Sequence, residues 1–296
     1  MSNKLFILLS LLSISTLSGC TLINEYKNDS SSDSKTETST ETDAKEETET
    51  IVYPDGYSRL SFHDEFEGSS LNTEYWGFDI GNGSNGWGNG EIEYYTNHNH
   101  TVSDGMLTIT AKKEGNSYTS SRLLTKDKVR LKYGYIEARI SLPIGSGLWP
   151  AFWMMPNNST YGGWPRSGEI DIMEARGRVP NEVSSALHFT QYESDAHTYL
   201  TRSYTLSSDF TNFHLYAVKW EEESISFFVD NEMHFSVSYE EWQTYSALSN
   251  SKAPFDQDFY IIINLALGGQ FDNYVTPLDT VYPTDMKIDY VRWFQK

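Results

Sequence analysis

Three carboxylates lie close together in the run GEIDIME at residues 168–174. Side chains alternate along a strand, so Glu169 and Asp171 should share one face while Ile170 and Ile172 point into the core. Strict alternation would also place Glu174 on the apolar side, where an unpaired carboxylate is costly. We therefore predict a β-bulge at Met173, which returns Glu174 to the face of the other two acids.

Three acids on one strand face have a definite chemical use. Two carboxyl groups about 5 to 5.5 Å apart suit retaining glycoside hydrolysis, in which one attacks the anomeric carbon and the other protonates the leaving oxygen. Asp171 would orient the nucleophile and help to keep one glutamic acid protonated by charge repulsion. The residues alone leave two alternatives open, a solvated polar strand face and a calcium site made of carboxylates.

Such a strand needs a sheet to hold it, and the rest of the chain reads mostly as strands. Short segments rich in β-branched and aromatic residues recur between turn signals, and we expect strands over 105–110, 133–141, 183–190, 213–220, 224–229, 259–265 and 286–294. The polar turn 230–232 predicts a hairpin that returns over 233–237. One short helix is expected near Tyr239–Tyr245. The sequence therefore predicts an all-β fold, a jelly roll of two antiparallel sheets with a concave substrate cleft.

The composition excludes several other functions. The 296 residues hold 22 basic and 41 acidic side chains, a net charge of −19, which argues against a nucleic-acid surface. Cys20 is the only cysteine, so an intramolecular disulfide, a cysteine zinc site and a redox pair are all excluded. Residues 51–296 alone carry −14, which disfavours a polyanionic polysaccharide as substrate.

The N-terminal region predicts export and anchoring. Lys4 precedes an apolar run over 5–17, which has the length of a signal-peptide core, and the run ends in LSGC at 17–20. This ending resembles a bacterial lipobox, in which Cys20 is lipidated; an ordinary cleavage site beside a chance cysteine is the alternative. Residues 21–50 hold nine acids and three lysines with few apolar side chains, and we expect a disordered acidic tether. Residues 51–296 are predicted to form the folded domain.

A family resemblance adds to this reading. The bulged string GEIDIME resembles the catalytic strand of glycoside hydrolase family 16 in the form found in laminarinases, agarases and carrageenases; lichenases lack the extra residue. The runs 147–156 and 163–168 are similar to the endo-β-1,3-glucanase branch and its related glucan-recognition proteins. Further matching blocks lie at 62–66, 86–91, 133–139 and 264–269. The resemblance covers about residues 62–294.

By position in these motifs, the resemblance implies that Glu169 is the nucleophile, Asp171 its assistant and Glu174 the acid/base. It also implies that Trp149 and Trp153 line the subsites on the non-reducing side of the bond. Core tryptophans are the alternative for both residues. Asn89 and Arg122 match family positions that hydrogen-bond the sugar hydroxyls, and His188 resembles a histidine that borders the leaving-group side. A surface arginine and a structural histidine are the alternatives for the last two. Trp164 is a further candidate for substrate binding, with a core position as the alternative. At Gly90 many relatives carry a second Asn, so one sugar contact is expected to be missing there.

The resemblance further suggests a structural calcium held by Glu65, the carbonyl of Gly105 and Asp289, although acids at strand ends are common in so acidic a chain. No cofactor is expected for catalysis. We predict an exported, membrane-anchored or cell-surface bacterial lipoprotein, a monomer that binds β-glucan. The alternatives are a family member acting on mixed-linkage glucan or a galactan, and a non-catalytic glucan-binding lipoprotein.

Overall fold

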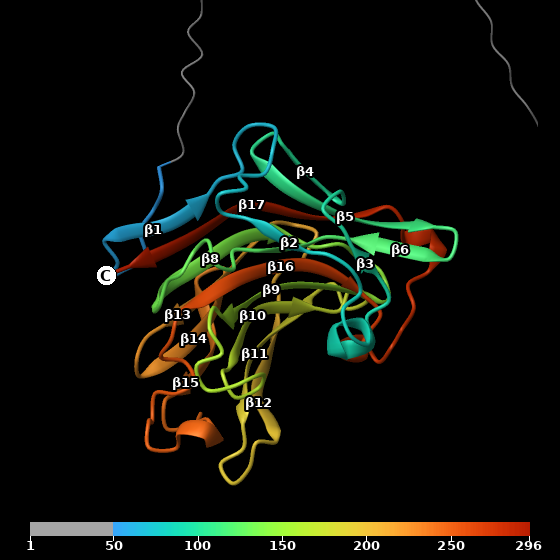
Figure 1. Cartoon of the computed structure of the whole chain (residues 1–296). Helices are drawn as coiled ribbons and strands as arrows, with labels where there is room; N and C mark the ends of the chain where they lie inside the picture. Colours follow the sequence, from blue (N-terminus) through green and yellow to red (C-terminus); the bar gives the residue numbers. More distant parts are fainter. Residues whose placement is uncertain (1–49) are drawn as a thin grey trace, which may run out of the picture. The chain divides into compact units, whose positions relative to one another are not determined.

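Two curved, mainly antiparallel sheets make up the fold of residues 50–296, the part of the chain that this computed structural model describes (Figure 1). The predicted signal peptide, lipobox and tether lie outside the described residues. Within these residues, no helix is long and apolar enough to cross a membrane. The predicted all-β jelly-roll architecture is confirmed.

The first sheet has ten strands, and its main path runs β15-β14-β13-β8-β17-β5-β6-β3, with β1 paired to β17 and β4 paired to β5. Its strands are β1 (Arg59–Asp64), β3 (Tyr94–Tyr95), β4 (His100–Ser103), β5 (Met106–Glu114), β6 (Ser117–Ser120), β8 (Gly134–Ser141), β13 (His214–Trp220), β14 (Ser224–Val229), β15 (Glu232–Ser238) and β17 (Thr284–Gln295).

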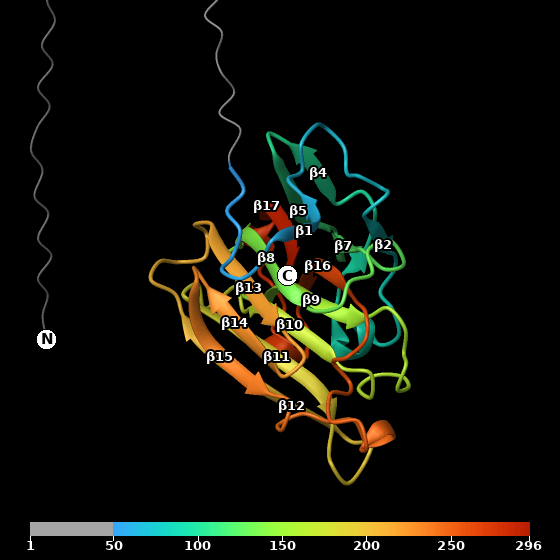
Figure 2. The same cartoon turned by 90° about the vertical axis from the view of Figure 1, so that its left-hand side faces the viewer.

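The second sheet has seven strands in the order β12-β11-β10-β9-β16-β7-β2. These are β2 (Gly77–Asp79), β7 (Arg122–Leu124), β9 (Leu148–Pro156), β10 (Glu169–Ala175), β11 (Glu182–Thr190), β12 (His197–Thr205) and β16 (Phe259–Leu267). Short helical segments are η1 (Gly86–Gly90), η2 (Tyr245–Ala247), η3 (Gln270–Asp272) and η4 (Asp279–Val281). In Figure 2 the strands from β9 to β12 lie side by side in this order.

Every strand predicted from the sequence is present, with bounds that differ by a few residues. The predicted hairpin is the β14–β15 pair, whose turn residues Asp230 and Asn231 adopt positive φ as a tight hairpin turn requires. The predicted helix at Tyr239–Tyr245 is wrong. That segment is a short turn followed by irregular chain up to the single 3₁₀ turn η2, and the buried Trp242 anchors it against Phe255.

Apolar side chains from both sheets fill the space between them. On β10, Ile170, Ile172 and Met173 are at most 2% exposed, and Phe152 of β9 and Ile263 of β16 join the same cluster. Burial of so much apolar surface holds the two layers together. The opposite face of the seven-stranded sheet is therefore the one on which β10 presents polar side chains.

Candidate active site

The predicted bulge is present in β10. Its pairing with β9 shifts between Asp171 and Met173, and its pairing with β11 shifts between Asp171 and Glu174. The extra residue lets Met173 remain buried while Glu174 lies on the same face as Asp171. The backbone thus brings Glu169, Asp171 and Glu174 together on one face of the sheet.

Asp171 is the buried centre of this group. Only 3% of the residue is exposed, and Nε2 of His188 lies 3.0 Å from its Oδ2. Burial and the nearby charge of Glu169 raise the pKa of Asp171. Burial alone would lower the pKa of His188, but the charge and hydrogen bond of Asp171 raise it to about 9. His188 therefore carries a positive charge at neutral pH and holds Asp171 in place.

Glu174 receives a hydrogen bond from Trp149. The indole Nε1 donates to Oε1 at 3.0 Å, and the Trp149 ring stacks on Phe271 with 5.0 Å between ring centroids. Burial, followed by the charge of Asp171, raises the pKa of Glu174 to about 8. Glu174 is thus a protonated carboxylic acid at neutral pH, which is the state that a general acid needs.

Glu169 lies at the start of β10, directly opposite His188 in the register with β11. Its Oε2 accepts a hydrogen bond from Nε1 of Trp164, a residue that is 51% exposed. Trp164 is therefore no core residue, and the structure places it beside the carboxylates.

Trp153 and Arg122 lie on the other side of β10, towards β7. Trp153 donates from Nε1 to Oδ1 of Asn264 at 2.7 Å. The guanidinium of Arg122 lies 4.8 Å from the Trp153 ring and 4.7 Å from the Trp87 ring, and it pairs with Asp79. Arg122 is thus fixed between two indoles.

Asn89 belongs to a hydrogen-bond network that the sequence did not reveal. Its Nδ2 donates to Glu91, whose other oxygen accepts from the Tyr95 hydroxyl. Tyr95 in turn accepts from Nδ2 of Asn264. Asn264 is a polar residue within the apolar run 259–267. It could have indicated this network from the sequence, because a buried amide needs hydrogen-bond partners.

The segment after β16 supplies a further wall that was not predicted. Asp272 is fully buried, and it accepts hydrogen bonds from the Gly147 backbone N–H and from Nε of Arg178. This anchor fixes η3, which carries the Phe271 ring that lies against Trp149.

Gly90, where many relatives were expected to carry Asn, lies close to Tyr274. A Cβ atom on Gly90 would lie 2.9 Å from the Tyr274 ring, so the missing side chain at Gly90 leaves room for that ring.

The expected calcium residues have other partners. Both oxygens of Glu65 accept hydrogen bonds from Arg292, and Asp289 pairs with Arg139. Each carboxylate already faces a guanidinium, so these contacts give no support for a shared cation site with the Gly105 carbonyl.

Among the described residues, one group of acids and histidines has possible metal-ligand atoms within 4.8 Å of one another. This group is Glu169, Asp171 and His188, which belong to the site on β10.

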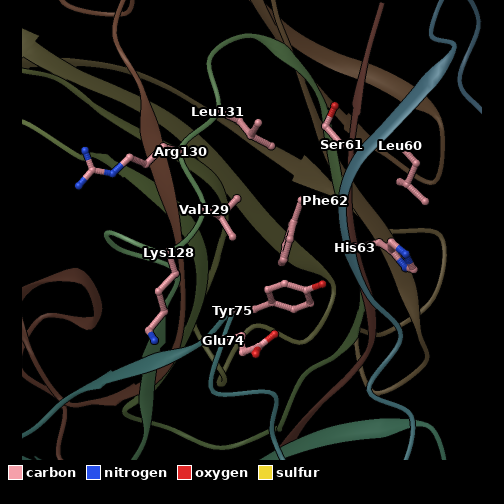
Figure 3. Close-up of a pocket in the computed structure, with 10 residues that line it drawn as sticks. All are labelled: Leu60, Ser61, Phe62, His63, Glu74, Tyr75, Lys128, Val129, Arg130 and Leu131. Atoms are coloured by element: carbon pink, nitrogen blue, oxygen red, sulfur yellow. The ribbon is translucent and has the colours of Figure 1, made fainter.

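A pocket of about 340 Å³ opens elsewhere, between β1 and the segment 128–131 (Figure 3). None of the predicted site residues lines it. Its Lys128 donates to the Thr73 carbonyl and its Arg130 pairs with Asp127, so both charges are used locally. We therefore place the active site on the face of β10 and not in this pocket.

Comparisons with known proteins show the family to which this fold and sequence belong. The family model described as glycosyl hydrolases family 16 matches residues 89–292. A glucan endo-1,3-beta-glucosidase A1 from Niallia circulans is 40% identical over 260 residues, which cover 80% of this chain but 38% of that protein. A beta-glucanase from Rhodothermus marinus is 38% identical over 250 residues, covering 80% and 85% of the two chains. The crystal structure of a laminarinase from Flavobacterium sp. UMI-01 superposes with a TM-score of 0.72 at 42% identity, covering 80% of this chain and all of that one.

Proposed function

The chain belongs to glycosyl hydrolase family 16, and we propose that it is an endo-acting enzyme that hydrolyses β-1,3-glucan with retention of configuration. The relatives named above support the substrate class. The observation that carries the proposal is the bulged strand β10, which gathers three acids on one face and places Glu174 where burial and Asp171 raise its pKa to about 8.

In the first step, Glu169 attacks the anomeric carbon as a carboxylate while Glu174 gives its proton to the leaving glycosidic oxygen. The hydrogen bond from Trp164 orients Glu169 for this attack. In the second step, Glu174 takes a proton from water, and the water oxygen displaces Glu169 from the sugar. Asp171, held by His188, supports Glu169 and repels negative charge on Glu174.

The side of the sheet towards β7 suits the sugars on the non-reducing side of the bond. Trp149 and Trp153 offer indole rings for the apolar C–H faces of glucose, and Arg122 and Asn89 offer donors for its hydroxyls. Their order along the sheet, from β9 to β7, supports a glucan chain that crosses the strands.

The carboxylates also separate the alternatives. A glucan-binding protein without activity has no need for three gathered carboxyl groups with a raised pKa at Glu174, so the site favours an enzyme. We further propose that the enzyme is exported, anchored through a lipid on Cys20 and monomeric; the N-terminal sequence supports the first two statements. Calcium at Glu65, Gly105 and Asp289 stays a prediction.

Release of reducing sugar from laminarin tests the proposal, with mixed-linkage glucan and agarose as alternative substrates. We expect laminarin to be degraded fastest, with loss of viscosity early in the reaction and a β-configured first product. Tight laminarin binding without any reducing-sugar release would instead identify a binding protein. A preference for agarose would identify a galactan hydrolase.

A further inference from the structure

A row of near-parallel rings, here called the aromatic row, lies beside the carboxylates on β11 and β12. It consists of His188, His197 and Tyr199. Glu169 pairs with His188, and His188 pairs with Tyr199, across three neighbouring strands. Residues paired in this way point to the same face of a sheet, so the aromatic row continues the face of the acids.

The rings of the aromatic row are closely aligned. His188 and His197 differ by 7° in plane, with centroids 5.0 Å apart, and their Nδ1 and Nε2 atoms lie 2.7 Å apart. A nitrogen–nitrogen hydrogen bond of this length joins the two imidazoles edge to edge. Tyr199 lies within 21° of both imidazole planes, with centroids 5.5 and 5.7 Å away. The residue is 54% exposed, and it therefore offers aromatic surface to a ligand.

Trp164 stands over one end of the row. Its ring is inclined by 40° to that of His197, with centroids 4.6 Å apart. The segment that carries Trp164 is tied to the turn before β12, because Nε and Nη2 of Arg166 donate to the two carboxylate oxygens of Asp195. This ion pair thus links the segment that carries Trp164 to the hairpin that carries the aromatic row.

The position of the row indicates which part of the substrate it meets. Trp149 and Trp153 lie on β9, on one side of β10, while β11 and β12 lie on the other side. A glucan chain that crosses β10 from β9 must leave over β11 and β12. Flat aromatic surface beside polar groups is what the C–H faces and hydroxyls of glucose require.

We propose that Tyr199 and His197 form a binding subsite for a glucosyl residue on the leaving-group side of the scissile bond, with Trp164 as its wall. This inference rests on the proposed glucanase activity. Because the subsite binds the departing sugar, its contribution disappears when the leaving group is not a sugar. Tyr199 is a substrate-binding residue in this proposal and takes no part in proton transfer.

Two substrates test the proposal on the same variants. One is a β-1,3-linked gluco-oligosaccharide, which places glucose over the aromatic row. The other is β-laminaribiosyl fluoride, whose leaving group is a single atom and whose hydrolysis is followed by fluoride release. We expect Tyr199→Ala to lower kcat/KM for the oligosaccharide about tenfold, because an aromatic stacking partner is lost. The same variant should leave kcat/KM for β-laminaribiosyl fluoride unchanged. Tyr199→Phe keeps the ring and should keep both activities.

Tyr199→Thr is a second truncation that suits an edge strand, should the alanine variant fold poorly. Tyr53→Ala removes another exposed tyrosine, which lies against Phe294 away from the carboxylates, and should alter neither activity. Equal losses on both substrates in Tyr199→Ala and Tyr199→Thr would overturn the proposal and assign Tyr199 to the support of the hairpin. No loss on either substrate would overturn it as well. A wild-type enzyme inactive on both substrates would refute the glucanase activity itself.

Discussion

Replacing Trp149 with Phe isolates one interaction in the active site. The substitution removes the indole N–H that donates to Glu174, and it keeps an aromatic ring to stack on Phe271. That hydrogen bond favours the ionised form of Glu174 and so lowers its pKa, against the larger opposite effects of burial and of Asp171. Losing the donor must therefore raise the pKa of Glu174 further.

The size of the change follows from the energy of the bond. A hydrogen bond to a charged group contributes about 1.5 to 3 kcal/mol, and part of it persists with the protonated acid. A difference of about 1.4 kcal/mol between the two protonation states corresponds to one pKa unit. We expect the pKa of Glu174 to move from about 8 to roughly one unit higher.

The assay is the pH dependence of kcat/KM on laminarin, which reports ionisations of the free enzyme. Glu174 must be protonated to act as an acid, so wild-type activity should fall as the pH rises through about 8. In Trp149→Phe this alkaline limb should move to higher pH. Trp153→Phe is the matched control, because its indole donates to Asn264 and not to Glu174, and its limb should stay in place. An alkaline limb that stays fixed or moves to lower pH in Trp149→Phe would refute this account of Glu174.

Four further outcomes are expected. Azide should rescue Glu174→Ala as a β-glycosyl azide, since an external nucleophile can attack the glycosyl-enzyme, and an α-configured product by NMR would refute retention. Trp153→Ala should lower kcat/KM on laminarin at least about tenfold with little change in Tm; full activity with a lower Tm would make Trp153 a core residue. Asp272→Ala should lower the free energy of unfolding by roughly 2 kcal/mol in urea titrations, because Arg178 and the Gly147 N–H lose a buried partner, and an unchanged midpoint would contradict this. Deleting residues 21–50 should leave kcat/KM and Tm of the domain unchanged, whereas Cys20→Ser should move the full chain out of the detergent phase; a large stability loss on deletion would show that the segment docks.

The sequence predicted the bulge because two rules conflict at Glu174. Alternation would bury that carboxylate, and burial of an unpaired charge is too costly, so an extra residue at Met173 was the remaining solution. The apolar strands were predictable for a similar reason, since β-branched and aromatic runs have few other stable conformations. The segment Tyr239–Tyr245 was misjudged because one short amphipathic stretch says little about helix formation, which is unfavourable at that length.

The aromatic row was not predicted because its members come together only through strand register. Strand β12 has exposed or half-buried side chains throughout, so it lacks the apolar alternation that marks a strand in sequence. His197 is nine residues from His188 along the chain, yet the two imidazoles share a hydrogen bond. A turn of different length between β11 and β12 would shift this register and separate them.

The indoles assigned to sugar binding also act on the catalytic acids. Trp149 donates to Glu174, and Trp164 donates to Glu169, so each glutamate has its own tryptophan partner. Such bonds restrict the carboxyl rotamers before substrate arrives, which lowers the cost of reaching the reactive geometry. An alanine at either position therefore removes both a stacking surface and a positioning contact. Only substitutions that keep the ring, such as Trp149→Phe, can separate the two contributions.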